Sequence, residues 1–374
     1  MSLRKLGKYK QRQTPCLLFT YLLVRVACIY SLPEKRVYKL TLPEPPIRSR
    51  FVVGSSLGWL VTVDKRSEMH IVNPITGEQI ALPSVITMEQ VKPIYNDLGA
   101  VHRYGYSRYT AKHVLPTLEV DLGLLQEYLH HKAFIFSDAS TGCFIVVLIF
   151  QPFGQLSFAR VGDDKWTWLP PHTEYEDCTY KDGLLYAVTL LGEIHAFDLT
   201  GPTVTIKIIM GTVHDFDCEV TYIVQAPWGD LLLVWRSKDF ENRDYDADPA
   251  TQVRITEEVK VYKVDTDAKR FVQINCLHDH VLFLGIGQSL CLNTEEYPCL
   301  NANHAYFTDD DEYLSNRKNN RRDTGVLDLD NNSRDNLVSP QLWSNCTTPV
   351  WFTPDLRMMK LALNKVVEGS SSSN

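Results

Sequence analysis

The chain has 374 residues, of which 44% are hydrophobic and 22% charged, so it can bury a full-sized core and is not intrinsically disordered. Its formal net charge of −7 argues against general nucleic-acid binding, which needs a basic surface to neutralise phosphates. No segment reaches the roughly 18 consecutive apolar residues that a membrane-spanning helix requires. We therefore expect neither nucleic acid nor a membrane as a partner.

The first 30 residues form a basic and apolar segment that we place outside the predicted domain. Its basic residues are Arg4, Lys5, Lys8, Lys10 and Arg12. The apolar run 17–24 resembles the core of a secretory signal peptide, although Arg25 ends the run early. We favour a cytoplasmic or nuclear protein over a secreted one, because the nine cysteines contain no Cys-x-x-Cys pair and their odd number indicates buried, reduced thiols.

One pattern recurs from residue 51 onward: a short apolar run, a turn carrying Gly or Asp, and a second strand. Copies lie at 58–77, 143–169, 182–209, 229–265 and, more weakly, 304–330. A period of roughly 40–50 residues is typical of β-propeller blades. A single blade has two apolar faces, so neighbouring blades must stack around a ring to bury both. The sequence therefore predicts an all-β fold, a kelch-like β-propeller of about six or seven blades over residues 51–355.

Helical spacing is found at residues 120–129, but Gly123 and the flanking strand patterns favour a loop or turn there. Trp166 and Trp168 are two residues apart on one predicted strand, so they share a face and are candidates for packing against the next blade. We place the propeller domain at residues 31–356 and a tail, Ser-rich at its end, at residues 357–374.

Two motifs carry residues that bind metals in other proteins. Asp244, Asp246 and Asp248 alternate as at the start of a calcium loop, but Pro249 and Ile255 replace the Gly and Glu that such a loop requires. The segment His278-Asp279-His280 could put two imidazoles on one strand face, yet no third ligand is nearby in the sequence. We favour loops for both segments.

Two further motifs also have simpler interpretations. The segment Gly285-Ile286-Gly287 lacks the third glycine of a dinucleotide-binding turn, so we interpret it as a β-turn. The acidic run 309–312 is interpreted as a solvated loop. No nucleophile motif is present, so no catalytic, cofactor-binding or metal-binding residue is assigned and no cofactor is expected.

Several motifs in consistent order over about residues 30–356 resemble the plant DUF295 family, also called the KIB1-4-type β-propeller family. They are Gly58-Trp59-Leu60-Val61-Thr62-Val63-Asp64, Val161-Gly162-Asp163-Asp164-Lys165-Trp166-Thr167-Trp168-Leu169, Tyr175-Glu176-Asp177 with Tyr180-Lys181-Asp182-Gly183, Tyr306-Phe307-Thr308-Asp309-Asp310 and Pro349-Val350-Trp351-Phe352-Thr353-Pro354. The resemblance implies an F-box-associated propeller: an F-box docks on a Skp1-like subunit of a ubiquitin ligase while the propeller holds the substrate.

The segment 1–30 departs from that family pattern, because it is too short and too basic to supply the helices of an F-box. We therefore expect a protein-interaction module that resembles the substrate-recognition propeller of F-box ubiquitin-ligase adaptors, without the Skp1-docking F-box and without a Skp1-like subunit as partner. Two alternatives stay open. One is a propeller enzyme or small-molecule binder that uses the axial channel, and the other is a degenerate family copy without ligase function.

The partner of such a module is an unidentified protein, and the long charged insertions at 237–251 and 310–324 are the candidate binding loops. The candidate contact residues in them are Lys238, Arg243, Asp244, Asp246, Asp248, Asp310, Asp311, Arg317, Arg321 and Arg322.

Overall fold

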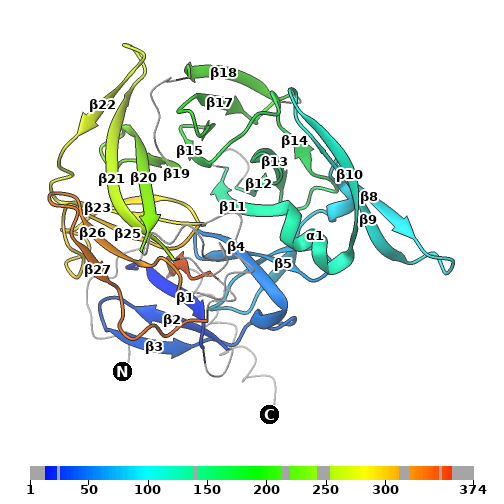
Figure 1. The fold of residues 1–374 in the computed structure, drawn as a ribbon, viewed down its shortest axis with the longest axis horizontal. Helices are drawn as coiled ribbons and strands as arrows, with labels where there is room; N and C mark the ends of the chain where they lie inside the picture. The colour runs from blue at the N-terminus through cyan, green and yellow to red at the C-terminus, as the bar shows by residue number, and fades with distance from the viewer. Residues whose placement is uncertain are drawn as a thin grey trace.

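The computed structural model describes residues 13–22, 26–138, 142–201, 203–212, 220–241, 253–310, 321–344 and 348–355. Within these residues most of the regular structure is strand and one α-helix is present, which confirms the predicted all-β class. The described strands form seven sheets, six with four or five strands and one with three. Figure 1 shows the larger sheets arranged around a common centre, as in a β-propeller.

Four of the larger sheets consist of four strands that follow one another along the chain, each antiparallel to the next. Their strands are β4 (Arg50–Ser56), β5 (Trp59–Asp64), β6 (Met69–Val72) and β7 (Gln79–Ala81); β11 (His130–Ser137), β12 (Phe144–Phe150), β13 (Gln155–Arg160) and β14 (Thr167–Trp168); β15 (Asp177–Lys181), β16 (Leu184–Val188), β17 (Ile194–Asp198) and β18 (Thr205–Met210); β19 (Val220–Gln225), β20 (Leu231–Phe240), β21 (Arg254–Asp265) and β22 (Arg270–Ile274). Each strong sequence copy lies within one such sheet and begins after its first strand.

The fifth sheet has a different strand order, β24-β23-β25-β26-β27. Its strands are β23 (His280–Leu284), β24 (Leu290–Asn293), β25 (His304–Phe307), β26 (Gly325–Asp328) and β27 (Arg334–Asn336). β23 runs parallel to β25, whereas β25 and β26 are antiparallel. The weak sequence copy at 304–330 therefore corresponds to a real strand pair. Its sequence pattern is weak because the strand order of this sheet is interrupted.

The radial stacking of the sheets follows from the apolar run in β12. Side chains alternate between the two faces of a strand. Ile145, Val147 and Ile149 belong to one buried cluster, which includes residues of the following sheet. Val146, Leu148 and Phe150 belong to another cluster, which includes residues of the preceding sheet. Both faces of this sheet are therefore covered by neighbours, as the propeller prediction requires.

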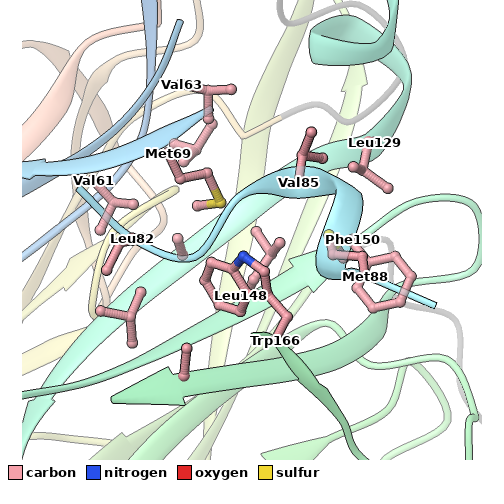
Figure 2. Close-up of a cluster of buried hydrophobic side chains, with 14 of the residues drawn as sticks. Val61, Val63, Met69, Leu82, Val85, Met88, Leu129, Leu148, Phe150 and Trp166 are labelled. Atoms are coloured by element: carbon pink, nitrogen blue, oxygen red, sulfur yellow. The ribbon is translucent and has the colours of Figure 1, made fainter. Parts of the chain in front are cut away.

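Figure 2 shows part of the cluster between the β4–β7 and β11–β14 sheets, where Trp166 lies near Leu148 and Met69. Trp166 is buried, and its indole N–H donates to the carbonyl oxygen of Pro83 at 2.8 Å. Trp168 is only partly buried and stacks on His172. The prediction that both indoles pack against the next blade is wrong for Trp166, because it packs against the preceding sheet.

The inner strands β4 and β11 approach each other closely at Gly54. A Cβ atom at this position would lie 1.7 Å from the carbonyl oxygen of Ala133, so no larger residue fits without backbone movement. The pairing of β4 with β5 also changes register between Val52 and Gly54, as at a β-bulge. This glycine therefore sets the spacing of two adjacent sheets.

The sixth sheet joins the two ends of the described chain. Its order is β28 (Val350–Phe352), β1 (Cys16–Thr20), β2 (Ala27–Ser31) and β3 (Arg36–Lys39). Leu17 of β1 lies opposite Trp351 of β28, and both are buried. The propeller therefore includes residue 16, and the domain boundary expected at residue 31 is too late. The apolar residues that resemble a signal peptide include this buried strand.

The three-stranded sheet projects from the ring (Figure 1) and is made of β8 (Val91–Tyr95), β9 (Val101–Tyr109) and β10 (Val114–Asp121). The helix α1 (Leu122–Leu129) follows it directly, so the expectation of a loop at 120–129 is wrong. Leu125 and Leu129, one turn apart, are fully buried, and the Gln126 amide donates to the carbonyl oxygen of Val63 at 2.6 Å. Tertiary packing thus outweighs the low helix propensity of Gly123. Two short 3-10 helices are η2 (Ile47–Ser49) and η3 (Val85–Thr87).

Four of the described cysteines, Cys16, Cys28, Cys178 and Cys291, are buried, whereas Cys143 and Cys299 are exposed. The expectation of buried thiols therefore holds for part of the set. Among the described residues, no helix has the length and apolar character needed to cross a membrane.

Candidate functional site

The first insertion predicted to contact a partner, 237–251, begins in described residues, and the described chain resumes at residue 253. The second, 310–324, begins and ends in described residues. Lys238 lies near the start of the first insertion and Thr256 shortly after its end, and Asp310 and Asp323 lie at the two ends of the second. Residues 242–252 and 311–320 lie outside the described residues. So do the candidates Arg243, Asp244, Asp246, Asp248, Asp311 and Arg317.

Three of the remaining candidates are buried: the exposed fractions of Lys238, Asp310 and Arg322 are 7%, 3% and 1%. Their interpretation as exposed contact residues is therefore wrong, and so is that of Asp309 and Asp310 as part of a solvated loop. Opposite charges that are far apart in the chain neutralise each other here, and the sequence does not reveal such pairing. The partly exposed Arg321 forms an ion pair with Glu241 at 2.5 Å, which joins the bases of both insertions.

Arg236 in β20 is the centre of a buried polar network. Its guanidinium donates to the Thr256 hydroxyl and the Asp323 carboxylate, each at 2.7 Å, and to the carbonyl oxygen of Thr308 at 2.9 Å. The same group lies over the ring of Phe307, 4.7 Å from its centroid. A planar guanidinium with several fixed donors suits this arrangement better than an ammonium group.

Asp310 is held by three cations. The Lys238 ammonium donates to its carboxylate at 2.8 Å, and Arg236 and Lys132 lie 3.3 and 3.8 Å from it. The hydroxyl of Tyr222 also donates to this carboxylate. Burial alone would raise the pKa of Asp310, but the three cations outweigh burial and hold the pKa well below its usual range. Asp310 is therefore ionised at any physiological pH.

Asp323 completes the connection between the two insertions. Its carboxylate accepts hydrogen bonds from the backbone N–H and the hydroxyl of Thr256, at 3.0 and 2.6 Å. Arg334 donates to its other oxygen at 2.8 Å. We refer to Arg236, Lys238, Thr256, Asp310 and Asp323 as the loop-base network. It ties all four ends of the two insertions to one buried point.

Asp177 lies beside the loop-base network, because Lys132 acts electrostatically on both Asp177 and Asp310. Its carboxylate accepts hydrogen bonds from the backbone N–H of Ile223 at 3.0 Å and the hydroxyl of Ser289 at 3.1 Å. It therefore joins β15 to β19 and to the segment before β24. Complete burial raises the pKa of Asp177 from 3.8 to about 7.

The described carboxylates and imidazoles do not gather as a metal site would require: no group of three or more His, Cys, Asp or Glu side chains could hold an ion. His278 and Asp279 lie in the turn before β23, as interpreted from the sequence. Gly285 and Gly287 lie in a bend between β23 and β24. The carboxylates of Asp310 and Asp323 are occupied by cations and hydroxyl donors, so neither is poised to accept a proton from a substrate.

Sequence patterns alone did not indicate Arg236, Asp323 or Tyr222 as site residues. One signal could have indicated Arg236, because Leu232, Val234, Arg236 and Lys238 alternate along β20 on its buried side. Charges that continue an apolar face indicate a buried ionic cluster. No comparable pattern surrounds Asp323, whose partners come from distant strands.

A model of the KIB1-4 beta-propeller family matches residues 29–328, which is most of the chain and includes the whole loop-base network. The chain belongs to the KIB1-4 β-propeller family. In this KIB1-4 propeller, strand β1 lies before the matched residues and strand β28 lies after them, although both belong to the sixth sheet. The family match thus confirms the predicted resemblance and the propeller fold.

Similar proteins of Arabidopsis thaliana carry F-box names. The F-box protein At5g55150 is 21% identical over 81% of this chain and 74% of its own length. F-box protein KIB4 is 22% identical over 64% of this chain and 56% of its own length. F-box only protein 7 is 31% identical over 40% of this chain and 37% of its own length. The aligned regions thus span only part of these relatives.

Among solved structures, the KIB1-4 propeller matches the β-propeller domain of Cps50 (Swd1) from Myceliophteria thermophila at 10% identity with a TM-score of 0.32. The alignment covers 72% of this chain and 88% of that one. Nothing about function follows from a likeness at this level.

Proposed function

We propose that this KIB1-4 propeller is a non-catalytic substrate-recognition module that binds a protein partner through the insertions 237–251 and 310–324. The observation that carries the proposal is the loop-base network, which joins the four ends of the two insertions although they are far apart in the sequence. Two insertions with a common rigid base present one binding surface rather than two independent ones. The F-box names of the relatives support a role in selecting proteins for a ubiquitin ligase.

The partner surface is tested by exchanging residues 242–252, or residues 311–320, for Gly-Ser segments of equal length. The matched control exchanges the exposed turn 96–100 between β8 and β9, which lies on the projecting sheet (Figure 1). Affinity purification from plant extract with quantitative mass spectrometry should recover at least one protein with the wild type and the control. We expect either loop exchange to reduce that recovery by about tenfold or more, as loss of a central contact does.

The protein that meets this criterion is then purified and titrated directly by calorimetry against the wild type and the three variants. Binding that both loop exchanges leave unchanged would overturn the proposed surface. Failure to recover any protein reproducibly, in extracts from several tissues, would overturn the recognition role itself.

Recruitment of a ligase is a separate question. Residues 16–20 and 27–31 are strands of the propeller, so they do not supply Skp1-docking helices. We propose that residues 1–374 form no stoichiometric complex with a Skp1-like subunit. Size-exclusion chromatography of the two purified proteins tests this proposal, with an F-box relative as the positive control, and co-elution at a 1:1 ratio would refute it.

The proposed place of action is the cytoplasm or the nucleus. A fluorescent fusion of the full chain in plant cells tests this location. Fluorescence in the secretory pathway would contradict it and would direct attention to the sequons at Asn331 and Asn345.

A further inference from the structure

A cavity of about 170 Å³ lies where the second insertion ends and the chain enters the fifth sheet. Its lining residues come from the segment before β26, from β27 and from the segment after β27, and they include Arg321, Arg322, Thr324, Arg334, Ser339 and Trp343. Ser339 is exposed, so the cavity opens to solvent. Pockets for whole small molecules measure roughly 300–1,000 Å³, so this smaller cavity suits a single functional group of a larger ligand.

Three guanidinium groups line the cavity, and each is held by a carboxylate that is not among the lining residues. The pairs are Arg321–Glu241 at 2.5 Å, Arg322–Asp309 at 3.4 Å and Arg334–Asp323 at 2.8 Å. Arg321 and Arg334 use one terminal nitrogen each in these pairs. Because a guanidinium carries five N–H donors, both keep donors for a ligand. Asp323 also accepts a hydrogen bond from Arg236 at 2.7 Å, so its single charge is shared between two guanidinium groups.

Three hydrogen-bond donors of the lining residues have no acceptor within the described part of the chain. They are the indole N–H of Trp343, the Nε–H of Arg334 and the hydroxyl of Thr324. Trp343 and Thr324 are only 3% and 4% exposed. Indole and guanidinium N–H groups can only donate, and buried polar groups normally have partners. These donors therefore indicate a ligand that supplies several acceptor atoms.

Guanidinium groups and unpartnered donors around one small cavity indicate an oxyanion. A phosphate monoester carries three terminal oxygens and a charge of about −1.5 to −2 near pH 7, so it satisfies more of these donors than a carboxylate with two oxygens and one charge. The small volume favours a short phosphorylated side chain. We propose that this cavity binds the phosphate group of a phosphorylated serine or threonine on the protein partner. This inference rests on the proposed function, because Arg321, Arg322 and Thr324 belong to the insertion 310–324 of the partner surface.

Calorimetric titration of the full chain with N-acetyl-O-phosphoserine N-methylamide tests the cavity without the partner. We expect saturable binding at one site that weakens as salt is added. The glutamate analogue with the same capping groups should bind at least about tenfold more weakly, because its carboxylate has fewer acceptors and less charge. Equal affinities for the two would overturn the ligand class. Tighter binding of inorganic phosphate than of capped phosphoserine would assign the cavity to a free anion, and the absence of saturable binding would overturn the site.

Two variants locate the binding. Arg321→Gln removes a partly exposed guanidinium and should lower the affinity for capped phosphoserine about tenfold. Its matched control is Arg103→Gln, which removes the same charge from another ion-paired arginine on the projecting sheet and should leave the affinity unchanged. Thr324→Val removes a buried hydroxyl without a partner, so the thermal midpoint should equal or exceed that of the wild type while the affinity falls several-fold. Unchanged affinity in both Arg321→Gln and Thr324→Val would refute the assigned site.

The role of the phosphate in partner binding is tested on the protein recovered by affinity purification. That protein is titrated against the KIB1-4 propeller before and after treatment with a broad-specificity protein phosphatase, and we expect dephosphorylation to weaken binding at least about tenfold. Binding that survives dephosphorylation but is lost in the loop exchanges would overturn this inference and leave the proposed function standing. Failure to recover any partner would overturn the proposed function, and the capped-phosphoserine titration would still decide whether the cavity binds phosphate.

Discussion

Arg236 and Asp323 meet at 2.7 Å inside the propeller although 87 residues separate them in the chain. Arg236 belongs to β20, and Asp323 precedes β26 in another sheet. Both side chains are at most 1% exposed, so their interaction is not weakened by water. The pair therefore links two sheets and fixes the relative position of the two insertions.

Removal of the Arg236 charge is expected to destabilise the protein strongly. Arg236→Met leaves the carboxylates of Asp310 and Asp323 with fewer partners in a buried site, and we expect a loss of about 3–5 kcal/mol in the free energy of unfolding. Arg236→Lys keeps the charge but not the several fixed donors of the guanidinium. Its free energy of unfolding should therefore lie between those of the wild type and Arg236→Met. Urea denaturation followed by circular dichroism measures both.

The matched control is Arg103→Met, because Arg103 also forms an ion pair, with Asp121 at 3.0 Å, but both side chains are largely exposed. Exposed pairs contribute about 1 kcal/mol or less. Equal losses in Arg103→Met and Arg236→Met would show that the loop-base network does not stabilise the fold.

The sequence predicts most of the architecture, because the apolar alternation of strands such as β12 and the Gly-Asp turns are local signals. It does not predict where distant segments meet. Arg236 and Lys238 look like loop-edge charges until Asp310 and Asp323 are placed beside them. The insertion of the projecting sheet and α1 between β7 and β11 is also hidden, because Leu125 and Leu129 become a buried face only when the first sheet lies beneath them.

A second prediction concerns Asp177 and pH. The folded-state pKa of about 7 lies above the ordinary value of 3.8, so between these values the folded protein binds more protons than the unfolded chain. The contribution of Asp177 to stability is therefore present below about pH 4 and is lost as pH rises through about 7. Asp177→Asn removes this loss and keeps an oxygen acceptor for Ile223 and Ser289.

We expect the difference in unfolding free energy between Asp177→Asn and the wild type to move in favour of the variant by on the order of 2–4 kcal/mol from pH 4.5 to pH 8. Lys132 is the charged group that faces Asp177, and its attraction for the ionised form is already contained in the pKa of about 7. The lowered pKa of Asp310 has the opposite pH dependence, but it is common to both proteins and cancels in the difference. A pH-independent difference would contradict the buried, proton-binding role of Asp177.

A third prediction tests the contact between β4 and β11. Gly54→Ala places a methyl group against the carbonyl oxygen of Ala133, so the two inner strands must separate. We expect a loss of about 3 kcal/mol or more, as for a severe overpacking change. Gly105→Ala in β9 is the control, because its added Cβ has only ordinary contacts with Lys92, the shortest at 3.8 Å. Thermal unfolding should separate the variants clearly, and similar midpoints for the two would refute the proposed close approach.

The last prediction concerns the closure of the ring by β1. A chain that starts at residue 29, where the family match begins, lacks Leu17, Leu18 and Phe19, each at most 2% exposed in the full structure. Burial of three such side chains contributes about 5–9 kcal/mol, which is comparable to the whole stability of a typical domain. The loss also leaves β28 with an unpaired edge, which favours aggregation.

We therefore expect residues 29–374 to be aggregated or unfolded, whereas residues 13–374 keep every described strand and give a cooperative transition. A synthetic peptide of residues 13–22, added during refolding of 29–374, should restore part of the monomer peak in size-exclusion chromatography. Equal thermal midpoints for the two truncated chains would show that β1 does not close the propeller.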